Sequence, residues 1–529
     1  MTMSRWFLAA TAALALGACT NEKLVYQTKA PFNPPPDSVN GFLGYYDAST
    51  KQTTCGNCHV EKQGNWASTK HAQAWEDLQA SGHASASCEG CHSVSELGNG
   101  VGHPAGYSVN PDSVYHDVQC ENCHGPGATH VASPTTQNEP LASIEVDTAK
   151  ANGCGGCHTG THEPFVDQWV QSAHGSGPAF SHAAGNPTCN PCHEGKTALA
   201  VKFGVSTNYV ERDSSKLERI VCVVCHDPHG ATPYAGQLRA SINEPTIDNL
   251  CVRCHSRSGT PPWSTAAAGG TARGAHGAQG LLVIGQNVGW IPPNFTYDTG
   301  QIVSSHGTSA NPRLCATCHV AFTTITDKAT GAFVFQSVGH LFAPIPCTDS
   351  AGIPTAEENC TLTQRDFSAC ATSGCHLTQQ AARSAFQAVD ARFNNLLDQI
   401  WTDVDSNNVI DATDGGLLPQ MVARGTAADS AALDFTSTTT TVAKGTLWNA
   451  ALAATNERQN FLGGKVYGVT FSTHMASGNG VHNPFLLEAL LTSSISALKQ
   501  AYGLTAPANV DLTVHAAPPP GLQVRSSLR

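Results

Sequence analysis

A five-residue pattern, Cys-x-x-Cys-His, occurs eight times and constrains the chain more than any other feature. The two thiols of each copy lie on one backbone turn, and an imidazole follows them directly. The 529 residues include 49 glycines and 30 prolines, and only 7% are aromatic. Turn formers therefore dominate, and the repeated thiol and imidazole groups must help to hold the chain together. The copies, numbered here as sites 1 to 8, span residues 55–59, 88–92, 120–124, 154–158, 189–193, 222–226, 251–255 and 315–319.

The pattern is typical of covalent haem attachment in c-type cytochromes. The two thiols add to the vinyl groups of one haem, and the histidine becomes the proximal ligand of its iron. Structural zinc also binds Cys-x-x-Cys pairs, but it does not need the histidine that follows all eight of them. We therefore expect haem. The predicted attachment residues are Cys55, Cys58, Cys88, Cys91, Cys120, Cys123, Cys154, Cys157, Cys189, Cys192, Cys222, Cys225, Cys251, Cys254, Cys315 and Cys318, with His59, His92, His124, His158, His193, His226, His255 and His319 as proximal ligands.

A ninth motif has a longer spacing. Cys370-Ala-Thr-Ser-Gly-Cys375-His376 places four residues between its cysteines. A loop of small residues can still bring both sulfurs to one porphyrin, and the alternative is a disulfide beside an unrelated histidine. We expect a ninth haem here and name the motif site 9. Nine haems use 18 of the 21 cysteines, and among the others Cys347 and Cys360 are predicted to form an intrachain disulfide.

The remaining cysteine belongs to the N-terminal segment. The apolar run from Trp6 to Leu16 is too short to span a bilayer and is typical of a signal peptide. It ends in Leu16-Gly17-Ala18-Cys19, which resembles a bacterial lipobox, and the alternative is an ordinary cleaved signal. We expect residues 1–18 to be a lipoprotein signal peptide and Cys19 to carry lipid. The exported protein would then be an outer-membrane lipoprotein that faces the periplasm or the cell surface.

The chain contains an internal repeat with an offset of about 100 residues. Trp66 and His71 follow site 1, and two more motifs come after them; Trp169 and His174 follow site 4 in the same way. We predict a tether at 19–54, three-haem modules at 55–150 and 151–240, and a looser three-haem unit at 241–376. Repetition of this kind predicts an extended body built around a chain of cofactors.

These elements resemble the multihaem cytochrome superfamily. The resemblance rests on the paired Trp and His, on CENCHGPGATH ending at His130, on CVVCHDPHG with His229, and on Gly480-Val-His-Asn-Pro484. It covers residues 55–376 and 474–503. The superfamily includes the tetrahaem acceptor of hydroxylamine oxidoreductase, octahaem tetrathionate reductases, pentahaem nitrite reductases and outer-membrane multihaem cytochromes. The resemblance implies that His71, His130, His174 and His229 are distal haem ligands.

The chain has more than enough histidines outside the attachment motifs to supply every iron with a distal ligand. Nine of the 24 histidines end attachment motifs, which leaves fifteen, and nine irons with two imidazoles each need nine of these. An isolated histidine is more often a surface residue, so nearness to a motif guides the choice. His103, His116, His162, His474 and His482 are reserves, and His515 is not expected to bind iron. The predicted distal ligands are His71, His83, His130, His174, His182, His229, His276, His306 and His340.

The region 377–515 is predicted to be helical. Phe386, Val389, Phe393, Leu396 and Ile400 form the apolar stripe of an amphipathic helix within 377–402. A second helix is expected to begin at Pro484 and to stop at Gly503, and the Pro-rich tail 516–529 is expected to be disordered. The predicted fold class is mostly α with large irregular content: an extended multihaem cytochrome wrapped around a haem chain, with a C-terminal helical segment.

Residues 403–414 match a calcium-binding loop with oxygen ligands at positions 1, 3, 5, 7, 9 and 12. Position 6 is Asn408 instead of glycine, and asparagine tolerates a left-handed backbone. Position 12 is Asp instead of Glu, and the alternative is a solvated acidic turn. The expected calcium ligands are Asp403, Asp405, Asn407, Val409, Asp411 and Asp414.

We predict extracytoplasmic electron transfer through bis-histidine haems, with other redox proteins or external electron acceptors as partners and no catalytic residue. Every motif ends in histidine and spare histidines are plentiful, so no iron needs an open position. One alternative is a multihaem oxidoreductase that acts on a small nitrogen or sulfur compound. Another is a filament-forming cytochrome subunit. The net charge of −12 disfavours nucleic acid as a partner.

Overall fold

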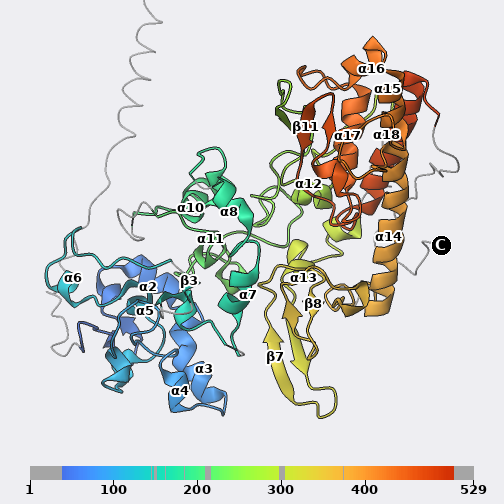
Figure 1. The fold of residues 1–529 in the computed structure, drawn as a ribbon. Helices are drawn as coiled ribbons and strands as arrows, with labels where there is room; N and C mark the ends of the chain where they lie inside the picture. The colour runs from blue at the N-terminus through green and yellow to red at the C-terminus, as the bar shows by residue number, and fades with distance from the viewer. Residues whose placement is uncertain are drawn as a thin grey trace, which may run out of the picture.

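The computed structural model describes residues 39–144, 146–147, 152–160, 162–183, 185–208, 216–296, 304–372 and 375–505. Figure 1 shows short helices joined by long irregular segments in the N-terminal part and longer helices in the C-terminal part. The predicted mostly α, irregular fold class is confirmed. No helix within these ranges is both long and apolar enough to cross a bilayer. The predicted signal peptide, Cys19, His515 and the tail 516–529 lie outside the described residues.

The N-terminal part has little continuous secondary structure. Its strands form small antiparallel pairs: β1 (Tyr45–Asp47) with β2 (Gln52–Thr53), β3 (Val146–Asp147) with β4 (Asn152–Gly153), β6 (Thr323–Thr326) with β7 (Phe333–Ser337), and β8 (Cys347–Thr348) with β9 (Pro354–Thr355). Its α-helices are α2 (Val60–Trp66), α3 (Ala74–Ala80), α4 (Ala86–Glu89), α5 (Cys120–His124), α6 (Ala128–Ala132), α7 (Phe165–Gln171), α8 (Pro178–Ala183), α9 (Asn190–His193), α10 (Gly195–Phe203), α11 (Cys222–Cys225), α12 (Gln279–Ile284) and α13 (Cys315–His319).

Buried polar groups connect the irregular segments. Glu121, inside site 3, accepts hydrogen bonds from the backbone N–H groups of Leu43, Gly44 and Gly127 at 2.8–3.1 Å. The Tyr45 hydroxyl donates to Asp117 at 2.7 Å. A buried carboxylate is stable only when such donors replace water. The attachment motif is therefore tied to segments before and after it.

The C-terminal part has a conventional hydrophobic core. Its helices are α14 (Gln379–Ile400), α15 (Leu417–Arg424), α16 (Ala427–Ala432), α17 (Val442–Ala453) and α18 (Pro484–Tyr502). Both predicted helices are confirmed: α14 lies within 377–402, and the Asn483 side chain caps α18 by accepting from the Leu486 N–H. Gly503 ends α18 with a left-handed φ of 60°. Leucine side chains of α18 are fully buried against α14 and α17.

Part of the predicted third haem unit belongs to this core. Strand β5 (Thr271–Arg273) pairs in parallel with β11 (Val469–Ser472), which also pairs with β10 (Lys465–Val466). The indole N–H of Trp263 donates to the carbonyl O of Lys444, and that of Trp448 donates to Gly259. Through these contacts, residues 259–289, which lie between sites 7 and 8, pack against the C-terminal helices.

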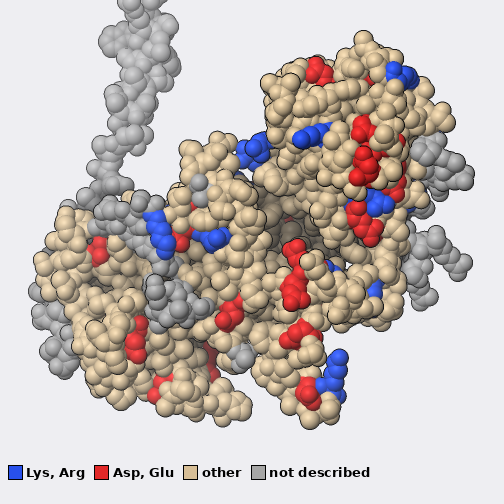
Figure 2. Space-filling view, viewed as in Figure 1, with Lys and Arg blue, Asp and Glu red and all other residues tan. Residues whose placement is uncertain are grey.

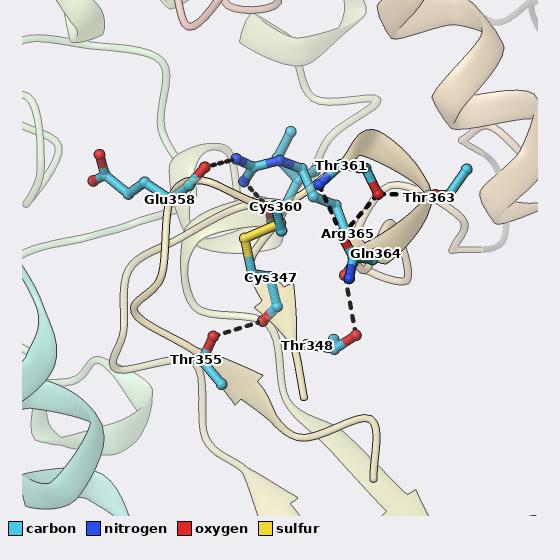
Figure 3. The surroundings of a disulfide bond; sticks show 10 residues. Cys347, Thr348, Thr355, Glu358, Cys360, Thr361, Thr363, Gln364 and Arg365 are labelled. Atoms are coloured by element: carbon cyan, nitrogen blue, oxygen red, sulfur yellow. Dashed lines mark hydrogen bonds between the residues drawn. A yellow bond between two sulfur atoms is a disulfide. The ribbon is translucent and has the colours of Figure 1, made fainter. Parts of the chain in front are cut away.

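The predicted disulfide between Cys347 and Cys360 is present (Figure 3). It joins β8 to the loop that precedes site 9. The Arg365 guanidinium crosses the same loop and donates to the carbonyl oxygens of Ile345 and Glu358. The disulfide and the arginine together hold the chain where it enters the ninth motif.

Candidate haem-binding sites

Most attachment motifs form a tight turn that brings two cysteines and one histidine together. At sites 1, 4, 6 and 7 the backbone N–H of the motif histidine donates to the carbonyl O of the first cysteine at 2.9–3.0 Å. At site 9 the N–H of His376 donates to the carbonyl O of Cys370 at 3.2 Å, although two additional residues lie between the cysteines. The longer motif therefore closes as the standard ones do.

Seven motif histidines face a second imidazole across a similar gap. Each of these second rings comes from outside the motifs. The distances between ring centroids are 6.2 Å for His158–His71, 6.2 Å for His124–His229, 6.2 Å for His255–His174, 6.0 Å for His193–His276, 6.4 Å for His226–His340, 6.2 Å for His319–His482 and 6.3 Å for His376–His306.

This gap fits an iron between two imidazoles. Two metal–nitrogen bonds of about 2 Å and about 1.1 Å from each nitrogen to its ring centre add up to about 6.2 Å. Rings in direct contact lie much closer, as Trp75 and His116 do at 3.9 Å. The recurrence of one spacing at seven motifs is expected if each pair is built to hold the same planar group.

Hydrogen bonds orient many of these rings. The Nδ1 atoms of His124, His226 and His319 lie 3.0, 2.6 and 2.8 Å from the backbone oxygens of Pro140, Gly236 and Phe342. Among the second rings, Nδ1 of His306 lies 2.8 Å from the Val481 oxygen, and that of His340 lies 3.0 Å from the Val338 oxygen. A carbonyl can only accept, so Nδ1 carries the proton and Nε2 keeps the lone pair that binds a metal.

Burial also keeps several rings neutral. It lowers the pKa of His71, His174 and His482 to about 4, with neighbouring imidazoles adding to the effect. A neutral imidazole is the form that binds metal ions.

The structure separates the predicted distal ligands into two groups. His71, His174, His229, His276, His306 and His340 each face a motif histidine. His83 and His182 are exposed, and Nδ1 of His130 lies 3.3 Å from the Asn138 side chain. Within the described ranges, no second imidazole faces His59 of site 1 or His92 of site 2 at this spacing. For His83, His130 and His182 the role of distal ligand stays a prediction.

Among the reserve histidines, His482 faces the site 8 histidine, and the sequence argument ranked it too low. It is distant in sequence from every motif, and the signal that pointed to it was the Gly480–Pro484 resemblance. The Asn483 cap places it directly before α18. His474 packs edge-on against His276 at 4.4 Å, His116 stacks on Trp75, and His103 and His162 are exposed.

The sequence repeat has an equivalent in three dimensions. The indole N–H groups of Trp66 and Trp169 donate at 2.9 Å to the carbonyl oxygens of Val118 and Ile220, each two residues before the third motif of its module. His71 and His174, five residues after these tryptophans, each face the first motif of the next module. Neighbouring modules are therefore joined through their imidazole pairs.

Cysteines of different motifs lie close enough to connect all nine sites. Cysteine side chains of sites 1 and 3, 2 and 4, 4 and 6, 5 and 7, 7 and 8, and 8 and 9 lie close enough to interact with each other. Cys123 and Cys154 are electrostatic neighbours that join sites 3 and 4, and Cys225 and Cys251 join sites 6 and 7 in the same way. The contacts among sites 1 to 4 recur among sites 4 to 7, three motifs further along the chain.

The candidate calcium loop is exposed and closes on itself. Carboxylate oxygens of Asp403, Asp405 and Asp414 lie within 4.8 Å of one another. Asn408 has a φ of 57°, the left-handed geometry expected at position 6. The Asp414 carboxylate is held by the Trp401 indole N–H at 2.8 Å, and the Asn407 side chain lies between Asp405 and Asp411.

Two family models match parts of the chain. "Cytochrome c554 and c-prime" matches residues 54–125, and "Doubled CXXCH motif" matches residues 217–260. The multihaem cytochrome MtrA of Shewanella baltica is 27% identical over 196 residues, which cover 33% of this chain and 54% of that protein. Cytochrome c-554 of Nitrosomonas europaea is 27% identical over 133 residues, or 20% of this chain and 54% of that protein. The chain thus matches about half the length of each relative, and no solved structure matches it significantly.

The motifs, the imidazole spacing and these matches define the class of protein. The chain is a multihaem c-type cytochrome, a class of protein whose haems are bound to pairs of cysteines. The resemblance seen in the sequence is confirmed.

Replacing His482 by alanine tests the imidazole pairs. We expect the His482→Ala holoprotein to gain one high-spin haem per chain by electron paramagnetic resonance, because the site 8 iron would lose its second imidazole. The matched control is His103→Ala, which removes an exposed histidine and should leave the spectrum unchanged. An unchanged spectrum of His482→Ala, with haem content intact, would contradict the pairing.

Proposed function

We propose that this cytochrome conducts electrons along its length through nine c-type haems, each with two axial imidazoles, between a redox protein and an external acceptor. The observation that carries the proposal is the unbroken series of attachment motifs whose cysteines lie near those of the next motif. Cysteines that lie close together would belong to neighbouring haems, and electron transfer needs neighbouring cofactors rather than a substrate pocket.

The contacts define a main path and two branches. The main path runs through sites 1, 3, 4, 6, 7, 8 and 9, with site 2 attached to site 4 and site 5 attached to site 7. The imidazole pairs reinforce the path, because His71 and His174 connect consecutive modules. Such a path suits the transfer of electrons from one end of the chain to the other.

The second candidate function, reduction or oxidation of a small nitrogen or sulfur compound, depends on sites 1 and 2. His59 and His92 are the motif histidines that face no second imidazole within the described residues. An iron with one imidazole could bind a small ligand in the open position. The conduit proposal assigns both irons a second imidazole from the spare histidines.

Carbon monoxide distinguishes these two functions. If all nine irons have two imidazoles, the oxidised holoprotein should give low-spin signals, and the reduced holoprotein should bind no stoichiometric carbon monoxide. Electron paramagnetic resonance and a carbon monoxide titration measure both properties. One carbon monoxide per chain without denaturation would reject the pure conduit, and hydroxylamine, nitrite and tetrathionate would be the first substrates to try.

We also propose that the protein is exported and anchored to the outer membrane by lipid on Cys19. The Cys347–Cys360 disulfide supports export, because disulfides persist in oxidising compartments. With that pair and nine motifs accounted for, Cys19 is the one cysteine left for lipid.

Membrane anchoring can be tested with Cys19→Ala. We expect wild-type protein in the membrane fraction and the Cys19→Ala protein in the soluble extracytoplasmic fraction, since acyl chains contribute about 0.8 kcal/mol per buried CH₂. Thr20→Ala serves as the neighbouring control. Retention of Cys19→Ala in membranes, with normal haem content, would argue against the lipid.

The loop at 403–414 is proposed to bind one calcium ion. Asp403, Asp405, Asn407, Asp411 and Asp414 would supply side-chain oxygens, and Val409 its carbonyl. The support is the close approach of three carboxylates and the left-handed Asn408. A bound cation would offset the repulsion among these carboxylates and fix the turn between α14 and α15.

Calcium removal should destabilise the C-terminal part. We expect about one calcium per chain after dialysis against trace calcium, and a lower melting temperature in chelator, because a ligand at a hundredfold excess over Kd stabilises by about 2.7 kcal/mol. Asp403→Asn/Asp405→Asn should lose both effects, whereas the control Asp327→Asn/Asp349→Asn changes exposed acids elsewhere and should keep them. Equal calcium content in the two double variants would mean that the loop at 403–414 is a solvated acidic turn and not a calcium site.

A further inference from the structure

A pocket with basic walls is lined by residues of α10, of α12 and of the segment that includes site 7. Figure 1 labels the two helices. The pocket has a volume of about 570 Å³. Val201 and Lys202 of α10 form one side, and Arg253 and Arg257 form another. Of the residues that line it, none is an attachment cysteine or a paired histidine, so the pocket adjoins the haem sites without being one of them.

The basic side chains are fixed in place. Arg253 donates to the carbonyl O of Lys202 at 2.7 Å, and its guanidinium lies 5.4 Å from the centroid of the Phe203 ring. Arg257 donates to the carbonyl O of Thr188 at 2.9 Å, directly before site 5. Among the described residues, the acid that pairs with them is the exposed Asp248, 3.6 Å from Arg253. Within this part of the chain, three cations and one anion leave the pocket positive.

This charge is unusual for the molecule. The chain has a net charge of −12, and Figure 2 shows acidic side chains spread over both parts of the visible face. A positive recess on an acidic protein attracts anions and steers them to one place. The rim adds apolar contact area, since Val201 is 61% exposed and Ile247 is 58% exposed. Apolar groups beside charges are typical of a protein interface rather than of a site for a small ion.

The pocket also lies at the end of a branch. Cys192 of site 5 lies near Cys254 of site 7, and the Lys202 ammonium also lies near Cys192. Arg257 is an electrostatic neighbour of His193 and His276, the imidazole pair of site 5. A branch is not needed to carry electrons along the main path. Because site 5 lies beside the positive pocket, this branch can instead connect site 7 on the main path to a partner protein.

We propose that Lys202, Arg253 and Arg257 form a docking pocket for an acidic electron-carrier protein, which exchanges electrons with the chain at site 5. Carboxylates of the carrier would pair with the three cations, and its apolar surface would cover Val201 and Ile247. At each encounter one electron would pass from the reduced carrier, which is thereby oxidised, to the haem that Cys189 and Cys192 would hold at site 5. The inference rests on the proposed conduit for the onward path through site 7.

Charge reversal tests the pocket. The oxidised holoprotein is mixed in a stopped-flow instrument with flavodoxin hydroquinone, an acidic protein donor, or with the methyl viologen radical, a small cationic donor. We expect Lys202→Glu/Arg257→Glu to slow reduction by flavodoxin about tenfold at low ionic strength, with the difference vanishing in high salt. Reduction by methyl viologen should not slow. Lys202→Gln/Arg257→Gln should give an intermediate effect with less risk to folding.

The matched control is Lys70→Glu/Lys328→Glu, which makes the same change of net charge at exposed lysines far in sequence from the pocket. It should reduce as the wild type does with both donors. If flavodoxin reacts equally with both charge-reversed proteins, the docking pocket is rejected. If both donors slow equally with the pocket variant, the cations act on the haems themselves, for instance by holding propionates, and docking is again rejected. Failure of the proposed conduit would give a different result: some haems would not be reduced by either donor, even in the control variant.

Discussion

The pairing of imidazoles across a constant gap is the interaction on which the haem-bearing part of this molecule depends. Seven pairs with centroid distances of 6.0–6.4 Å connect segments that share almost no regular secondary structure. The aliphatic clusters there are small, and among the described residues the extensive core belongs to the C-terminal helices. In the holoprotein, iron–imidazole bonds and thioether bonds would act as cross-links, and cross-links stabilise a chain that lacks a large core.

The pairs also explain why the modules cannot be independent units. His71 of the first module faces site 4 of the second, and His174 of the second faces site 7. The C-terminal part contributes His482 to site 8 and, through the carbonyl of Val481, orients the ring of His306. Each unit therefore supplies an imidazole to the next one, and the same arrangement brings attachment motifs of neighbouring units together.

The two parts of the chain divide structural tasks. The C-terminal helices bury a conventional core, which includes Trp263 and β5 from the segment between sites 7 and 8. That core places His482 without forming an attachment site. The N-terminal part uses buried groups such as Glu121 and Trp66 as fixed hydrogen-bonding points, because irregular backbone needs specific partners when it leaves water.

The sequence by itself determined the chemistry that depends on short spacing. Attachment motifs, the Cys347–Cys360 pair, the calcium-like loop and the start and stop of α18 are local, so their residues are neighbours whatever the rest of the chain does. Only the tertiary structure decided which imidazole faces which motif, because the partners come from different modules. His482 shows the limit: nearness in sequence ranked it low, and the packing of α18 brings it to site 8. The order of the nine sites and the basic pocket lined by residues of α10 and α12 arise in the same way, from contacts that no spacing rule encodes.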